Sequence, residues 1–205
     1  MSEKDYLQDI SEIKQLMNQS SKFLSLSGLS GVFAGIYALI GAYWAQLLIR
    51  DEMVIARPYT QEQAMLLLKL LLLAFAVLVF SILTALYFSY KKARRNKEKM
   101  WDVSSKNLLT SFLLPLLTGA VFALILINRQ YYGLLSGVTL IFYGLSLINA
   151  SKYTYGTIYY LGILEVITGL VAVAIPGYGI YFWALGFGLF HILYGLIMYY
   201  KFDRK

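Results

Sequence analysis

The sequence contains no cysteine, one histidine and three prolines among its 205 residues. The missing thiols exclude disulfides, thiolate zinc sites, iron–sulfur clusters and cysteine nucleophiles within this chain. Charged side chains are scarce as well, because they make up 14% of the residues, against about 25% in soluble domains. Apolar side chains make up 59% and stand in long runs, so we do not expect one water-soluble domain.

Six long apolar runs predict an all-α, polytopic membrane protein. A helix of about 20 apolar residues crosses a hydrocarbon layer of about 30 Å, and lipid offers the backbone no other hydrogen-bond partners. The alternating pattern of transmembrane β-strands is absent, which argues against a barrel. The predicted spans form a six-transmembrane-helix bundle at Leu24–Leu48, Leu66–Tyr90, Leu108–Ile127, Leu134–Ala150, Thr157–Ile175 and Tyr178–Tyr200.

A polar segment, residues 1–22, precedes the first span. Its apolar side chains recur at helical spacing, at Tyr6, Ile10, Ile13 and Met17. This predicts a short N-terminal amphipathic helix that lies on the inner membrane face or docks on a partner. No short apolar run precedes the first span, so we expect no secretory signal. The transmembrane domain is then expected over 23–200, with a basic cytoplasmic loop at 91–107 and a cytoplasmic tail at 201–205.

The basic residues are distributed unequally between the two sides of the predicted membrane. With the N-terminus inside, 14 of the 18 Lys and Arg residues lie on the inner side, and the rest are Arg50, Arg57, Lys69 and Arg129. This positive-inside bias predicts that both termini are cytoplasmic. Seven basic residues fall within 91–106, where we expect anionic lipid headgroups, and not nucleic acid, as the partner.

Small residues recur at four-residue spacing in two of the predicted spans. Ser27, Gly31 and Gly35 do so in the first span, and Gly133 and Gly137 do so in the fourth. Small residues at this spacing let two helix backbones approach closely. We therefore predict close helix packing within the chain, with a homo-oligomer seam or another membrane partner as the alternative.

Two ionisable side chains stand deep within predicted spans, Glu165 in the fifth and His191 in the sixth. At about 1.5 Å per residue, both lie roughly 12–14 Å from the cytoplasmic side. The tight Pro176-Gly177 turn makes these spans antiparallel neighbours, so we expect the two side chains to meet. The contact is either a structural hydrogen bond or a proton- or cation-binding site, to which Tyr159, Tyr160 and Tyr194 could add hydroxyls.

No other chemistry-bearing motif is present. One histidine and one carboxylate are too few for a metal centre, and no Gly-rich phosphate loop occurs, so we expect neither a metal nor a cofactor. The run Gly28-Leu29-Ser30-Gly31 resembles the G-x-S-G motif of rhomboid intramembrane serine proteases, which also have six core spans and a histidine in the last.

The departures from the rhomboid pattern put a protease in doubt. In that family the serine lies early in the fourth span, whereas this motif lies in the first, and a second-span histidine is missing. The corresponding Ser136 and His191 are expected at different depths, although a nucleophile and its base must approach to about 3 Å. A rhomboid-like protease stays a remote alternative, and we expect no catalytic residues.

Two further resemblances concern whole segments. The N-terminal run from Ile10 to Gly28, with Ser20-Ser21-Lys22-Phe23 at its centre, resembles small bacterial integral membrane proteins of unassigned activity. The hairpin Tyr160–Tyr199, rich in glycine around Pro176, is similar to hairpins of bacterial six-span acid-resistance membrane proteins. These resemblances imply a bacterial inner (plasma) membrane.

The sequence as a whole predicts a non-enzymatic structural, sensing or accessory factor. The alternative is a small proton- or cation-linked transporter or channel that uses the buried pair of Glu165 and His191.

Overall fold

The computed structural model describes Phe23, residues 25–53, 61–97 and 100–204, without the side chains of 51–53 and 61–63. The amphipathic helix predicted within 1–22 lies outside the described residues, as does Lys205 at the end of the predicted tail. Within the described ranges 88% of the residues are helical and no strand occurs, which confirms the all-α prediction.

Six helical segments of the described chain are long and apolar enough to cross a membrane. The first three are α2 (Gly28–Met53), α3 (Gln61–Arg95) and α4 (Val103–Asn128). The fourth joins the single turn η1 (Tyr132–Leu134), α5 (Leu135–Ala150) and η2 (Ser151–Tyr153), and the fifth is α6 (Thr157–Ala174). The last runs without a break through α7 (Gly179–Trp183), the π-helical η3 (Ala184–Phe190), α8 (His191–Met198) and the π-helical η4 (Tyr199–Asp203).

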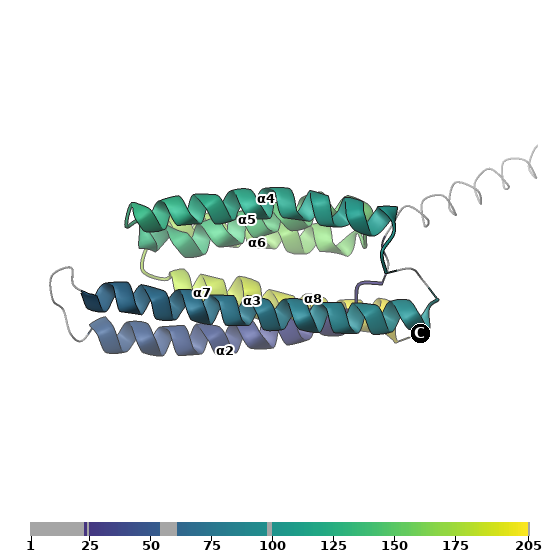
Figure 1. Cartoon of the computed structure of the whole chain (residues 1–205), viewed down its shortest axis with the longest axis horizontal. Helices are drawn as coiled ribbons and strands as arrows, with labels where there is room; N and C mark the ends of the chain where they lie inside the picture. Colours follow the sequence, from purple (N-terminus) through teal and green to yellow (C-terminus); the bar gives the residue numbers. More distant parts are fainter. Residues whose placement is uncertain (1–22, 24, 54–60, 98–99, 205) are drawn as a thin grey trace, which may run out of the picture.

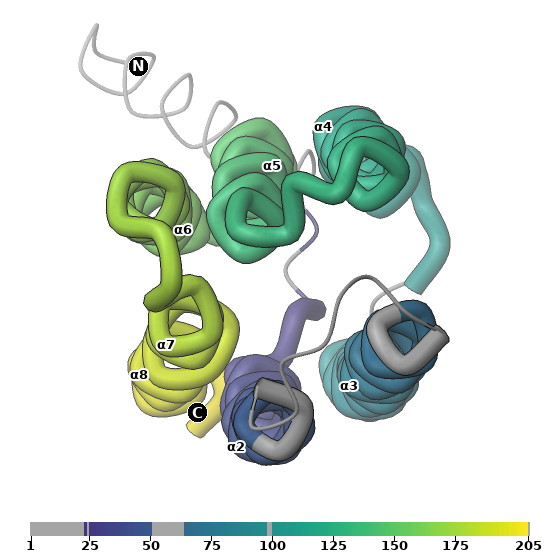
Figure 2. Tube along the Cα trace, turned by 90° about the vertical axis from the view of Figure 1, so that its left-hand side faces the viewer, coloured from purple at the N-terminus to yellow at the C-terminus, as the bar shows by residue number. Residues whose placement is uncertain are grey.

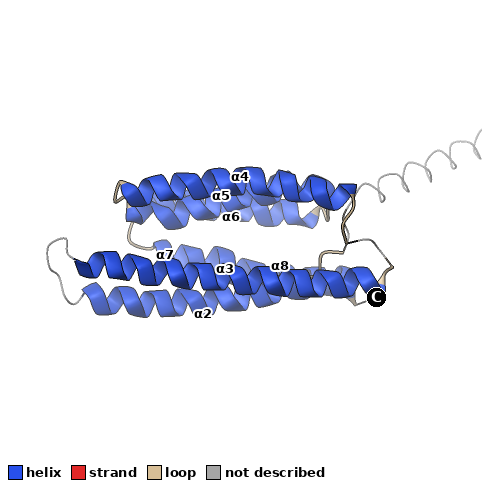
Figure 3. Ribbon diagram, in the orientation of Figure 1, coloured by secondary structure: helices blue, strands red, loops and turns tan. Residues whose placement is uncertain are grey.

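The helices form two layers (Figures 1 and 3). One layer holds α4, α5 and α6, and the other holds α3, α2 and the last span. Within the layers α5 packs on both α4 and α6, and α2 packs on both α3 and α8 (Figure 2). The layers meet where α7 and η3 contact α5 and α6.

The outward helix faces are apolar. The most hydrophobic stretch of α3 has no buried residue, and Leu72, Phe75 and Leu83 are 58–63% exposed. A soluble protein rarely leaves so large a contiguous apolar surface in contact with water, because its hydration is unfavourable. The surface therefore has the character of one that faces lipid.

Two glycine pairs bring α5 and α6 into backbone contact. A Cβ atom added to Gly144 would lie 2.6 Å from the Gly162 carbonyl oxygen, and one added to Gly137 would lie 2.7 Å from that of Gly169. Both helices carry their glycines seven residues apart, so in this antiparallel pair a glycine of one helix faces a glycine of the other at two levels. Close backbone approach of this kind is the main source of van der Waals attraction between helices in lipid.

The same arrangement joins α2 to the last span. A Cβ atom added to Gly35 would lie 2.6 Å from the Gly188 carbonyl oxygen, and one added to Gly195 would lie 2.7 Å from that of Gly28. The glycines are again seven residues apart on both helices. The small-residue face predicted in the first span is therefore covered by another helix of the same chain.

A proline inside α4 is accommodated by a neighbouring side chain. Pro115 has no N–H, so the carbonyl of Ser111, one turn earlier, loses its helical partner. The Asn149 side chain of α5 donates a 2.8 Å hydrogen bond to that carbonyl. An unpaired carbonyl would be costly in an apolar environment, so this bond fixes α4 against α5.

A buried ion pair holds together the end of the bundle at which α3 ends and α4 begins, here called the basic end. Lys92 of α3 lies 2.6 Å from Asp203 of the last span, and their side chains are 6% and 8% exposed. The second carboxylate oxygen of Asp203 accepts hydrogen bonds from the Gly28 amide and the Ser27 hydroxyl, at 2.7 and 2.9 Å. Asp203 therefore caps the first turn of α2 from the far end of the sequence.

The basic end also ties the two layers to each other. Lys92 donates to the Tyr155 hydroxyl at 3.0 Å, and Tyr155 belongs to the connection between α5 and α6. Phe23, just before α2, donates its amide to the Tyr153 carbonyl and accepts from the Thr154 hydroxyl, both at 2.8 Å. The α5–α6 connection is thus hydrogen-bonded at this end both to α3 and to the segment before α2.

We expect Asp203→Ala to lower the free energy of unfolding by about 3 kcal/mol or more, because it leaves the Lys92 ammonium buried without its counter-charge and removes the cap on α2. Unfolding of the purified chain in mixed micelles measures the effect.

Two further variants test this explanation. Arg204→Ala, at the exposed neighbouring position, should stay within about 0.5 kcal/mol of the parent chain. The double variant Lys92→Met/Asp203→Ala should be more stable than Asp203→Ala alone, since no unpaired charge is then left inside. Equal losses in the single and double variants would contradict the ion-pair explanation.

Candidate functional site

The structure brings Glu165 of α6 and His191 of α8 together at the centre of the bundle. The His191 Nδ1 atom lies 3.4 Å from Glu165 Oε1. Glu165 has no solvent-exposed surface, and His191 is 7% exposed. Glu165 is the eighth residue after the start of α6, and His191 is the twelfth after the start of α7, so each lies near mid-span.

Both ionisable residues have the same sequence spacing from the glycines on either side of them. Glu165 follows Gly162 by three residues and precedes Gly169 by four, and His191 stands in the same way between Gly188 and Gly195. Residues three and four apart lie on neighbouring parts of a helix surface, so each side chain lies next to a seam of close helix contact. The seams leave little room for either side chain to extend toward water.

Hydrogen bonds fix the tautomer of the neutral His191 ring. Nδ1 lies 3.0 Å from the Gly186 carbonyl oxygen, which can only accept, so Nδ1 carries the hydrogen and donates it. Nε2 lies 2.7 Å from the Tyr143 hydroxyl. In the neutral ring Nε2 has no hydrogen and must therefore accept from that hydroxyl.

Glu165 contrasts with His191, because neither of its carboxyl oxygens has a hydrogen-bond partner among the described residues. A buried polar group without a hydrogen bond costs on the order of 1–3 kcal/mol, and a buried isolated charge costs more. Native interiors satisfy most such groups. A proton or a positively charged neighbour would therefore stabilise this carboxyl.

A glycine in the π-helical segment makes room for the carboxyl. A Cβ atom added to Gly186 would collide with Glu165 Oε2 and with the Leu140 side chain, which is itself fully buried. The same residue supplies the carbonyl that orients His191. Isolated π-helical turns in α-helices often mark functional positions, since they change which backbone groups face the neighbouring helices.

Aromatic rings surround the cluster on the α5 side. Tyr143 contacts Phe187 and Phe112 at ring-centroid distances of 5.0 and 5.9 Å, and Phe187 contacts Trp183 at 4.9 Å. The Tyr143 ring also lies 5.3 Å from the His191 ring. The position of Tyr143 is thus fixed by packing as well as by its hydrogen bond.

The sequence reasoning missed Tyr143 as a site residue and proposed three other tyrosines. Tyr159 and Tyr160 are 43% and 68% exposed, and their rings contact each other. The Tyr194 hydroxyl lies 3.4 Å from that of Thr157, nearer the basic end. With 18 tyrosines in the chain, only the structure distinguishes the one that reaches His191.

The proposed packing residues have different surroundings. Gly31, Gly35 and Gly137 lie in helix seams, where an added Cβ atom would meet a neighbouring backbone at 3.2 Å or less. Ser27 instead donates to Asp203 at the basic end. Gly133, in η1, would meet no atom within 4 Å and so takes no part in a seam.

The described residues show neither a serine–histidine pair nor a metal cage. Both ring nitrogens of His191 are engaged by Tyr143 and Gly186, while the Ser30 hydroxyl donates to the Ser27 carbonyl at 2.6 Å. Within the described ranges, no three His, Asp or Glu side chains come together as metal ligands would.

No protein-family model matches the chain, and neither a curated protein nor a solved structure matches it. The function must therefore be argued from the chemistry of the Tyr143–His191–Glu165 cluster and from its position in the fold.

We expect Gly186→Ala to lower the free energy of unfolding by about 1–3 kcal/mol, because the new methyl group must displace Glu165 or Leu140 from a closed seam. Gly133→Ala is the matched control, and its effect should stay within about 0.5 kcal/mol, since its methyl group meets open space. Thermal unfolding of both variants measures the difference, and equal stability of the two would contradict the geometry.

Proposed function

We propose that this chain is an integral protein of a bacterial inner membrane, with both termini cytoplasmic, that binds a proton between its helix layers. In this proposal it is a non-enzymatic sensing or accessory factor. The observation that carries the proposal is the buried Glu165 carboxyl, which lies beside His191 but has no hydrogen bond among the described residues.

A single proton on His191 reverses its hydrogen bond with Tyr143 and gives Glu165 a positively charged neighbour, while the bond from Nδ1 to Gly186 stays the same. With neutral His191, the Tyr143 hydroxyl donates to Nε2 and the Glu165 carboxyl lacks a donor. With protonated His191, both ring nitrogens donate, so Nε2 bonds to the tyrosine oxygen and the positive ring faces the carboxylate. The added proton therefore converts an unsatisfied buried group into one half of an ion pair. Protonation of Glu165 itself would remove the buried charge by another route.

A proton fits this cluster better than a metal cation. Hard cations such as Na⁺, Mg²⁺ or Ca²⁺ need several oxygen ligands, about six for Mg²⁺ and six to eight for Ca²⁺. Among the described residues, the oxygens that pair with His191 come from one carboxyl, one hydroxyl and one carbonyl. A proton needs only one acceptor and one neighbour to share it.

The position of the cluster couples proton binding to the packing of the layers. Glu165 and Tyr143 belong to one layer and His191 to the other. The contact between the layers in this region involves α7 and η3, which adjoin His191. A change of charge at the cluster therefore alters the attraction between the layers, as a sensing function requires.

Transport of protons or cations is the second candidate, and the unsatisfied carboxyl favours it as well. A carrier must open its site alternately to the two sides of the membrane. Glu165 has no exposed surface in this conformation and stands between two glycine contacts. Sensing requires no such opening, and for this reason we place it first.

The emission of Trp183 should report proton binding. In a chain with Trp44→Phe and Trp101→Phe, Trp183 is the one remaining tryptophan, and its ring contacts Phe187 beside Tyr143 and His191. We expect its fluorescence in liposomes to change reversibly in a pH titration, as the cluster gains or loses a proton. Glu165→Gln, His191→Gln and Tyr143→Phe should each abolish or displace this change.

Tyr194→Phe is the control, because it removes a hydroxyl from the same span that bonds to Thr157 instead. Its pH response should match that of the parent chain. If the responses of Glu165→Gln and His191→Gln also match it, the proposal is wrong. Proton flux into liposomes, measured with an enclosed pH dye and lost in both variants, would instead favour transport.

Thiol labelling tests the proposed orientation. The chain has no native cysteine, so a single introduced thiol is unambiguous. We expect Tyr131→Cys, between α4 and α5, to react with a membrane-impermeant maleimide added outside the inner membrane. Asn96→Cys, exposed after α3, should react only after permeabilisation. The reverse labelling pattern would contradict the proposed orientation and place both termini outside.

A further inference from the structure

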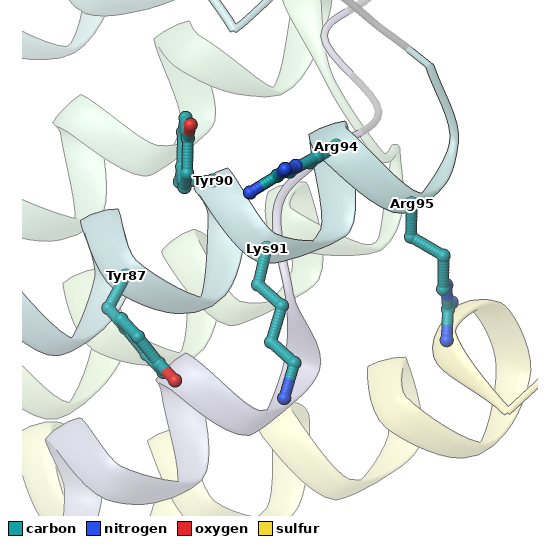
Figure 4. A pocket seen from close by; sticks show the side chains of 5 residues that line it. All are labelled: Tyr87, Tyr90, Lys91, Arg94 and Arg95. Carbon is teal, nitrogen blue, oxygen red and sulfur yellow. The ribbon is translucent and has the colours of Figure 1, made fainter.

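A surface groove of about 450 Å³ lies on α3 where this helix reaches the basic end (Figure 4). Two tyrosines and three basic residues of this one helix line it, and they are Tyr87, Tyr90, Lys91, Arg94 and Arg95. In Figure 4 Arg94 extends toward Tyr90 along one edge of this surface, while Tyr87 and Lys91 extend along the other edge. Each tyrosine thus stands one turn before a cation.

Four of these residues share one face of α3. Tyr87, Tyr90, Lys91 and Arg94 follow one another at the three- and four-residue steps that align side chains on a helix. The same face continues toward mid-span with Leu83 and Phe80, which are 58% and 59% exposed. Along this stripe the surface changes from apolar to aromatic and then to cationic.

The two cations on this face are available for a ligand. Lys91 and Arg94 are exposed, and neither has an acidic partner within the described part of the chain. Lys92, one residue further on, lies on another face and is buried against Asp203. Arg95, at the edge of the groove, donates to the Asp203 backbone carbonyl at 3.1 Å. The helix therefore uses Lys92 and Arg95 for the fold and leaves Lys91 and Arg94 unused by it.

We propose that this face of α3 binds one anionic phospholipid. Its phosphate lies between Lys91 and Arg94, whose positive charges complement it. Tyr87 and Tyr90 lie at the level between headgroup and acyl chains, where amphipathic rings gather in membrane proteins. The acyl chains run along Leu83 and Phe80. An acidic soluble protein would match the cations alone and would leave the continuous apolar part of the stripe without a role.

The inference rests on insertion of the bundle in a membrane but not on proton binding at Glu165. The variants that test it lie on another helix and leave the proton cluster unchanged. Loss of lipid binding with an intact Trp183 response, or the opposite result, would separate the two proposals.

The test uses the purified full chain in a non-ionic detergent with equal amounts of phosphatidylglycerol and phosphatidylcholine of the same acyl chains. Native mass spectrometry counts the lipid retained. We expect the parent chain to retain phosphatidylglycerol preferentially. Since a basic residue near an anionic membrane surface contributes about 1 kcal/mol, Lys91→Gln/Arg94→Gln should reduce this preference roughly 20- to 30-fold.

Lys97→Gln/Lys106→Gln is the matched control, because it removes the same charge from exposed positions at the same end of the bundle. Its preference should stay within about twofold of the parent chain. If both double variants lose the preference for phosphatidylglycerol equally, the preference depends on net charge alone, and the proposed site is wrong. The proposal also fails if the parent chain retains both lipids equally, or if inorganic phosphate displaces phosphatidylglycerol, as it would from a site for free phosphate.

Discussion

Backbone contact between glycines is the constraint on which the rest of the structure depends. Helices whose outward faces are as apolar as lipid gain little from hydrophobic burial against each other, so close van der Waals packing has to hold them. Gly144 meets Gly162 in one layer, and Gly35 meets Gly188 in the other. These contacts leave no space for a larger side chain at the glycine positions. They therefore fix how deep the neighbouring residues lie and which way these residues point.

Glu165 and His191 are the residues on which this constraint acts most strongly. In an open bundle a glutamate could extend toward the membrane surface, where its charge would be hydrated. Between Gly162 and Gly169 it is held instead against Leu140 and Gly186. The fold therefore maintains beside a histidine a carboxyl that has no hydrogen bond to any described residue, although either an amide or an apolar residue would be easier to bury. In the proposed function, this unfavourable arrangement is the reason why proton binding would alter layer packing.

The sequence predicts the features that depend on composition and on position along the helices. Apolar runs indicate six spans, and equal depth along neighbouring helices predicts that Glu165 meets His191. Features that depend on the mutual rotation of helices are not predictable in this way. Tyr143 is one tyrosine among 18, and nothing local distinguishes it. From the sequence alone, Asp203 has the character of a residue in a polar tail, because its partners Lys92 and Gly28 are more than 100 residues away.

The two polar clusters differ in what a conformational change would cost. Opening the layers at the basic end would break the bond between Lys92 and Tyr155 and those between Phe23 and the α5–α6 connection, several of them buried. At the opposite end the described chain crosses between the layers through the turn after α6, where Gly177 has φ +93°. Such a turn tolerates small rotations better than a buried, hydrogen-bonded cluster does. Separation of the layers is therefore less costly at the end opposite to the basic one. In the proposed orientation, with both termini cytoplasmic, that end faces outward.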